Sequence, residues 1–333
     1  MNTIEALLLT DEFKKNLINQ LIKKLEENYV FPEVALTINE KLVEFTKGEK
    51  FALLSAPEEF CTSISQILQS VNHDRHLALH FLEHSKKEES NDEDQFEMEE
   101  GTWLNNFGFA KCEILPGNVG YLKLNIFDLP HLAGDTAVAT MNFLVNTSGL
   151  IIDLRENGGG DPDMVNILMS YFFETDIHHT TFYNRAENKE IQFWTMSYVP
   201  GKKYLEKPVR VLTSKYTFSA AESFAYNLKH LNRAKIVGEN TGGGAQPGRP
   251  HILHPQFEVF ISHGRAVSTV TNTNWEGVGV EPDTLIDSKE AFDKAYEDIL
   301  SGLLDSEEYC LHKPLKVEAE KQLNKLNKMF GII

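Results

Sequence analysis

The first part of the chain places apolar residues at the spacing of a helix. Three segments, residues 11–31, 31–48 and 55–72, each have an apolar face opposite lysines, glutamates or other polar residues. The apolar positions of the first segment are Phe13, Leu17, Leu21, Ile22 and Leu25, and those of the third are Phe60, Ile64, Ile67 and Leu68. Pro32 lies in the first turn of the second segment and Gly48 at its end. Residues 1–85 are therefore predicted to form a small N-terminal helical domain.

From about residue 105 the pattern changes to strands that alternate with helices. Apolar strands are predicted at residues 119–127, 149–157, 207–214 and 234–240, and helices at 135–146, at 162–173 and from Ser219 onward. Such alternation indicates an α/β fold with a mostly parallel sheet. Residues 105–333 are predicted to be this α/β core, and the acidic run at 86–104 to be a linker or loop. Parallel sheets carry functional groups at the carboxyl ends of their strands, here after residues 153 and 213.

Composition excludes several classes of protein. The 333 residues are 41% hydrophobic and 24% charged, as in globular proteins, and the formal net charge is −17. So acidic a chain argues against nucleic acid or an anionic lipid surface as a partner. Three widely spaced cysteines, Cys61, Cys112 and Cys310, form no disulfide framework. We see no signal peptide and no membrane span, so we expect a cytoplasmic protein, and a homo-oligomer stays open.

Ser219 carries two interpretations. The stretch Ser219-Ala-Ala-Glu222 fits a capping box, in which the serine merely starts a helix. A serine at a helix N-terminus is also suited to acyl transfer, because its own amide and that of Ala220 are unpaired there and the helix dipole favours negative charge. No G-x-S-x-G motif surrounds it, and the glycine run at 158–160 is no phosphate loop. These four residues alone favour the cap.

Four sequence motifs, which occur in a fixed order along the chain, favour the second interpretation of Ser219. GLIIDLRENGGG, VLTSKYTFSAAESFAYNL, AKIVGENTGGGAQP and NWEGVGVEPD together closely resemble the S41 serine peptidases, the tail-specific or C-terminal processing proteases and their relatives. The resemblance covers roughly residues 105–290. It implies an α/β core of the ClpP/crotonase-like kind. It also implies that Ser219 is the nucleophile, so that one residue would be both cap and nucleophile.

The sequence departs from the Ser-Lys branch of this family. Gly244 stands where that branch has its lysine, no lysine occurs between Lys235 and Lys289, and no PDZ-like segment is present. The chain is more similar to the branch of the tricorn core and the interphotoreceptor retinoid-binding protein modules. That resemblance implies His76, in Asp74-Arg-His76, as general base and Glu276 as the carboxylate that orients it. It implies an oxyanion hole from Gly158 or Gly159 together with the Ala220 amide.

Alternatives stay open at several of these positions. His73, His76, His80 and His84 would share one face of a helix and could bind a metal, but the segment fits a strand equally well, and ordinary surface histidines are a further alternative. Glu281 is the rival of Glu276, although it falls in a predicted turn. Asp153 and Arg155 are expected to pair structurally, and Asn157 to make a turn.

Two functions follow from the resemblance. The first is a serine-type peptidase that acts on a peptide or protein substrate through an acyl-enzyme and needs no cofactor. The second is a non-catalytic protein that binds an apolar ligand on the same scaffold, since a fold does not fix its function. Retention of Ser219, His76 and Glu276 together favours the enzyme.

Overall fold

The computed structural model describes residues 9–82 and 102–329, which form two compact units. Among the described residues, the first unit comprises 9–82, 182–191 and 246–266, and the second comprises 102–181, 192–245 and 267–329. The sequence predicted a contiguous N-terminal domain. The first unit instead also includes a distant hairpin, because this hairpin pairs with a strand that follows the helices.

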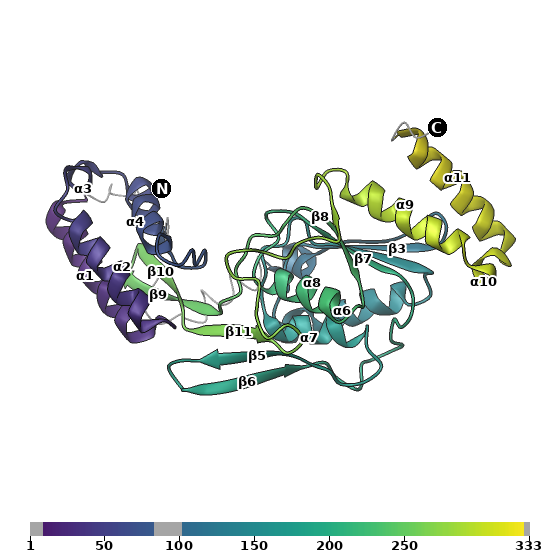
Figure 1. Ribbon diagram of the computed structural model, residues 1–333, viewed down its shortest axis with the longest axis horizontal. Helices are drawn as coiled ribbons and strands as arrows, with labels where there is room; N and C mark the ends of the chain where they lie inside the picture. Colours follow the sequence, from purple (N-terminus) through teal and green to yellow (C-terminus); the bar gives the residue numbers. More distant parts are fainter. Residues whose placement is uncertain (1–8, 83–101, 330–333) are drawn as a thin grey trace. The chain divides into compact units, whose positions relative to one another are not determined.

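The first unit packs helices against a small antiparallel sheet (Figure 1). Its helices are α1 (Asp11–Asn28), α2 (Pro32–Phe45), α3 (Glu49–Leu53) and α4 (Pro57–Gln69), and its strands are β1 (Ala78–Phe81), β9 (Gly248–His254) and β10 (Phe257–Ser262), in the order β1-β10-β9. Leu17, Leu21 and Leu25 are buried as their spacing predicted. They share one apolar core with side chains of α4 and β10. The short helix α3 was not predicted.

The second unit is built on a six-stranded sheet (Figure 1). Its strands, in spatial order, are β12 (Thr284–Leu285), β8 (Lys235–Gly238), β7 (Val209–Thr213), β4 (Gly149–Asp153), β3 (Val119–Leu124) and β2 (Phe109–Leu115). Neighbouring strands are parallel except β2, which runs antiparallel to β3. The predicted mostly parallel sheet is therefore confirmed, whereas β2 and β12 were not predicted.

Helices cover this sheet because its strands are apolar on both faces. All five residues of β4 are buried, as expected of an inner parallel strand. The helix α9 (Ala291–Leu304) packs through Ala295, Tyr296 and Ile299 against side chains of β3, β4, β7 and β8. Further helices are α6 (Pro130–Leu144), α7 (Pro162–Ser170), α8 (Ala220–His230), α10 (Glu307–Cys310) and α11 (Lys313–Met329), with a 3₁₀ turn η1 (Asn106–Gly108) before β2.

A third sheet, in the order β11-β5-β6, consists of β11 (Gly264–Ser268), β5 (His178–Asn184) and β6 (Lys189–Trp194). The chain passes between the two units within each of these strands. No helix in residues 9–82 or 102–329 has the length and apolar character that a membrane crossing requires. The loops that matter for function leave the carboxyl ends of β4, β7 and β8 in the second unit.

Candidate active site

Ser219 occupies a strained position directly before α8. Its backbone angles are φ 53° and ψ −119°, outside the regions that residues with a side chain normally adopt. Strain of this kind costs free energy and persists only where surrounding contacts impose it, which is common at functional sites. Phe218 contributes one such contact, since its amide donates to the Asn157 carbonyl at 3.1 Å. A serine that only capped a helix would take extended angles without strain.

The strand ends are tied together on the approach to Ser219. The Ser214 hydroxyl donates to the Arg155 carbonyl at 2.6 Å, and the Thr217 hydroxyl donates to the Leu154 carbonyl at 2.8 Å. Both bonds join the loop after β7 to the loop after β4, its parallel neighbour in the sheet. The nucleophile candidate and the glycine run are thus held side by side.

Glu222 joins the Ser219 backbone to the loop after β8. Its Oε2 accepts from the amides of Ser219 and Gly244, both at 2.8 Å, and its Oε1 accepts from the Gly243 amide at 2.6 Å and from the Thr241 hydroxyl at 2.5 Å. The side chain is fully buried. Burial raises the pKa of this carboxyl, and the four hydrogen bonds oppose that rise. The glutamate of the predicted capping box is therefore present, but it also organises three loop residues.

The glycine run after β4 packs directly against Ser219. A Cβ on Gly159, whose φ is +119°, would lie 2.8 Å from Ser219 Cβ and 3.1 Å from the Ala220 amide nitrogen. Only glycine fits so close an approach at that angle. Asn157 fixes the turn: its Oδ1 accepts from the Gly159 amide at 2.9 Å, and its Nδ2 donates to the Leu124 carbonyl at 3.0 Å.

Two amides near Ser219 have no acceptor among the described residues, those of Gly158 and Ala220. Ala220 is the first residue of α8, where a backbone amide lacks an intrahelical partner. Gly158 is exposed, and a Cβ added to it would meet no atom within 4 Å. The amide of Gly159, by contrast, is already bonded to Asn157. Of the two glycines that the sequence offered as oxyanion donors, Gly158 is the one whose amide is available.

Glu276 belongs to a loop that is bonded to the loop after β8. Its Oε2 accepts from the Ala245 amide at 2.6 Å, the indole of Trp275 donates to the Gly244 carbonyl at 2.9 Å, and the Gly277 amide donates to the Gly243 carbonyl at 2.9 Å. Hydrogen bonds therefore connect Ser219 through Glu222 and this loop to Glu276. Glu281 differs, because its side chain is exposed and, among the described residues, its carbonyl accepts from the Lys229 ammonium.

His76 lies in the first unit, two residues before β1. Asp74 is fully buried, and its Oδ1 accepts from the His76 amide at 3.1 Å while its Oδ2 accepts from the Tyr29 hydroxyl at 3.1 Å. The imidazole stacks on Phe260 of β10, with ring centroids 5.5 Å apart and an interplanar angle of 25°. Burial lowers the pKa of His76 to about 4, so the ring is neutral at pH 7. Asp74 thus sets the backbone from which this histidine projects.

The structure brings together the candidates of the second unit, Ser219, Ala220, Gly158, Gly159 and Glu276, and places His76 in the first unit. Residues 78–81 form a strand, so the histidines share no helix face there, and the described residues hold no cluster of metal ligands. His84 lies outside the described residues. Asp153 and Arg155 pair as expected, with Nη2 2.6 Å from Oδ2.

Sequence reasoning missed the roles of three residues. Asn157 was expected to make a left-handed turn, but its φ is not positive and its side chain instead binds Gly159 and Leu124. Glu222 was seen only as half of a cap, and Asp74 only as part of a motif. Each is a buried polar side chain within six residues of a candidate site residue. The sequence does not show which polar side chains are buried, so it did not indicate these roles.

The core matches the model of peptidase family S41 over residues 118–286, and residues 1–103 match the N-terminal domain of Peptidase_S41 in eukaryotic IRBP. The chain belongs to peptidase family S41. Over 217 residues it is 32% identical to the carboxy-terminal processing protease CtpB of Bacillus subtilis, which covers 64% of this chain and 41% of CtpB. It is 30% identical over 173 residues to the chloroplastic carboxyl-terminal-processing peptidase 1 of Arabidopsis thaliana, covering 50% of this chain and 33% of that protein.

A solved structure agrees with this family membership at the level of the fold. The structure of mature CPAF complexed with lactacystin has a TM-score of 0.57 at 11% identity, and the match covers 91% of this chain and 99% of that one. At this identity the likeness shows the fold alone. The predicted fold class, an α/β core with a mostly parallel sheet after a helical N-terminus, is thereby confirmed. The chain spans less than half the length of the two processing peptidases.

Proposed function

We propose that this S41 chain is a serine-type peptidase in which Ser219 is the nucleophile. The observation that carries the proposal is the strained Ser219 backbone, with Gly159 packed against it and the Ala220 amide open beside it. An acyl-transfer enzyme needs a nucleophile next to amides that can bind the oxyanion, and these features supply both. Matches to processing peptidases, of which this chain covers less than half, support the same reaction class.

In the proposed reaction the Ser219 oxygen attacks the carbonyl carbon of a peptide bond and passes its proton to His76. The carbonyl electron pair moves onto oxygen, which the Gly158 and Ala220 amides bind. Collapse of this intermediate breaks the C–N bond, and His76 returns the proton to the departing amine. Water then cleaves the ester by the same steps, with His76 again as base and then acid. Glu276 accepts from the other imidazole nitrogen and keeps the ring in the required tautomer.

The alternative, a non-catalytic protein that binds an apolar ligand, is not favoured. A binding scaffold has no need of a strained serine beside open amides, since strain costs stability and is retained where function uses it. Gly159 and Glu222 both hold Ser219 in that strained state.

Labelling with a fluorophosphonate tests the nucleophile. The full chain should form a single adduct at Ser219, located by mass spectrometry, and hydrolyse an unfolded protein substrate. Ser219→Ala should abolish both while costing only about 0.5–2 kcal/mol of stability, the range for loss of an N-cap serine. His76→Ala should reduce labelling at least about a hundredfold, the usual contribution of a general base. His80→Ala is the matched control, because this exposed histidine lies on β1 four residues away. Turnover by a folded Ser219→Ala protein would refute the mechanism.

A further inference from the structure

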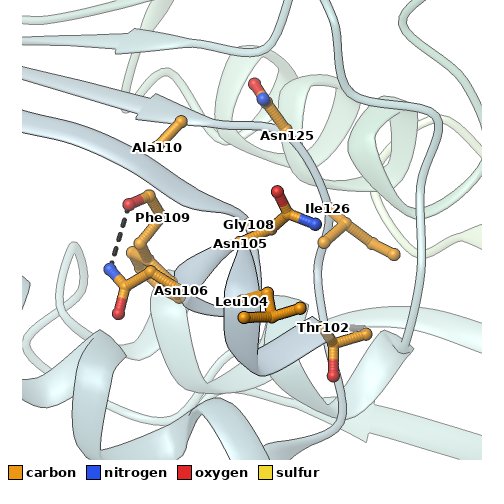
Figure 2. Close-up of a pocket in the computed structure, with 9 residues that line it drawn as sticks. All are labelled: Thr102, Leu104, Asn105, Asn106, Gly108, Phe109, Ala110, Asn125 and Ile126. Atoms are coloured by element: carbon orange, nitrogen blue, oxygen red, sulfur yellow. Dashed lines mark hydrogen bonds between the residues drawn. The ribbon is translucent and has the colours of Figure 1, made fainter. Parts of the chain in front are cut away.

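Strand β2 forms one edge of the six-stranded sheet in the second unit. It pairs with β3 along one side, and no strand of the described residues pairs with its other side. At its start the side-chain amide of Asn106 donates to the Phe109 carbonyl at 3.1 Å, the dashed bond in Figure 2. The free side of an edge strand presents backbone N–H and C=O groups that another strand can bind. β2 is therefore a candidate interaction surface.

The side chains of β2 carry opposite charges two residues apart. Its sequence is FAKCEIL, in which Lys111 and Glu113 lie on one face and Cys112 and Ile114 on the other. The Lys111 ammonium lies 2.5 Å from Glu113 Oε1, and both side chains are at least one-third exposed. The strand thus has no net charge, and its charges remain accessible to a partner.

β2 lacks most of the features that protect a sheet edge from pairing. Protected edges are usually very short, or carry a lysine, a proline or a bulge. β2 has seven residues, and the charge of its lysine is balanced by Glu113. Its bulge lies between Phe109 and Lys111, so residues 111–115 keep a regular register with β3. This regular part of the edge can accept a further strand.

The charges of β2 match a second copy of the same strand in one register. In an antiparallel pair centred on Cys112, Lys111 of each copy lies directly opposite Glu113 of the other. Opposite charges in directly facing positions stabilise such a pair, and like charges destabilise it. A pair centred on Lys111 or on Glu113 would place like charges opposite each other. Charge therefore selects the register centred on Cys112, which a two-fold axis between the copies produces.

The other face of β2 offers apolar surface to the same partner. Ile114 is 50% exposed, and Phe143 of α6 is 52% exposed. Phe143 and Cys112 both line a pocket of about 500 Å³ between α6 and β2. In the register centred on Cys112, Ile114 of the second copy is the diagonal neighbour of Cys112 and comes to lie beside the pocket wall. Pairing would thus remove apolar surface from water while it satisfies the free backbone groups.

We propose that β2 is a homodimer interface, at which two copies of this chain join their sheets by antiparallel pairing of β2 centred on Cys112. Backbone hydrogen bonds and the burial of Ile114 supply affinity, and the pairs between Lys111 and Glu113 fix the register. The partner is a second copy rather than an unrelated peptide, because the charge pattern of β2 complements itself. This interface does not depend on the proposed peptidase function.

Sedimentation velocity of the full chain between ~1 and ~100 μM tests the interface. The wild type should show a reversible equilibrium between monomer and dimer in this range. Lys111→Glu and Glu113→Lys, each alone, should raise the dissociation constant of the dimer about tenfold or more, because each change turns two attractive pairs into two repulsive ones. The double variant Lys111→Glu/Glu113→Lys should dimerise like the wild type, since it exchanges the charges and keeps them matched.

A second exposed ion pair provides the matched control. Lys189, the first residue of the edge strand β6, pairs with Glu187 at the same two-residue spacing. Lys189→Glu should leave the dissociation constant unchanged. Oxidation of the wild-type dimer with diamide should join two copies through Cys112, because directly facing residues of an antiparallel pair lie within the reach of a disulfide.

Three results would overturn the proposal. The first is a wild type that stays monomeric over the whole concentration range. The second is a double variant that dimerises as weakly as the single variants, since matched charges would then not define the interface. The third is a dimer that Lys189→Glu dissociates, or one in which oxidation joins the copies through Cys61 or Cys310, because either would place the interface on another face.

Discussion

The hydrogen bonds around Glu276 distinguish it from Glu281 at the level of single residues. Glu276 is half-buried and accepts from the Ala245 amide, whereas the Glu281 side chain is exposed. A carboxylate that orients an imidazole must be held in place, which favours Glu276 over Glu281 for the proposed role. Loss of the acceptor should affect turnover more than substrate binding, because the imidazolium that it stabilises forms during the reaction.

We therefore expect Glu276→Gln to lower kcat strongly with little change in KM, since the same kind of change in a related triad costs about 10⁴ in rate. Glu281→Gln is the matched control and should retain near wild-type kinetics. Both are measured by steady-state hydrolysis on folded protein. If Glu281→Gln were the inactive variant, the assignment of the orienting residue would have to move to Glu281.

His76 gives a prediction for the pH dependence of the reaction. The ring must be neutral to accept a proton, and burial lowers its pKa to about 4. kcat/KM reports groups of the free enzyme, so it should stay constant from pH 8 to about pH 5 and fall as the pH drops through about 4. The ordinary histidine value, ~6.5, is what the sequence alone suggests. An acid limb centred near that ordinary value would show that His76 is either solvated or not the base.

At the level of elements, the loop after β4 is specified by close packing against the start of α8. Gly159 has a positive φ and almost touches Ser219, while Gly158 has open space where a side chain would be. Gly159→Ala should force the loop, and with it the Gly158 amide, away from Ser219. Labelling and hydrolysis should then fall at least about a hundredfold, the cost of losing an oxyanion donor. Gly158→Ala keeps its amide and should retain most of the activity. Equal effects of the two substitutions would contradict this placement of the oxyanion site.

The same elements show how far the sequence reaches. Helices α1, α2 and α4 and strands β3, β4, β7 and β8 follow local periodicity, which depends only on neighbouring residues. The hairpin of β9 and β10 was missed because its strands are short and because β10 pairs with β1, which lies about 180 residues earlier in the chain. Ser219 and the glycine run were found because they follow apolar strands. The bonds of Glu222 and Asn157 were not, because each joins loops far apart in sequence.

At the scale of the whole molecule, the stability of the second unit should respond to acid. In the second unit His179 is 2% exposed; its Nε2 is 2.9 Å from Asn166 Oδ1, and its Nδ1 is 3.0 Å from the Thr180 hydroxyl. The amide of Asn227 donates to that hydroxyl at 3.1 Å, which leaves the hydroxyl proton for Nδ1. The network thus fits a neutral ring. Burial, with a smaller effect from His178, lowers the pKa of His179 to about 4.

His179 therefore makes unfolding easier in acid. Between its ordinary pKa, ~6.5, and about 4 the unfolded chain binds a proton that the folded chain does not, so the free energy of unfolding decreases as the pH falls through this window. One such group contributes a slope of up to about 1.4 kcal/mol per pH unit, and none above the ordinary pKa. His179→Gln removes the titration, so the difference between wild type and variant should shrink as the pH falls from 7.5 to 5. Urea unfolding at these pH values measures it, and parallel stability curves for the two proteins would show that His179 is protonated in the folded state or solvated.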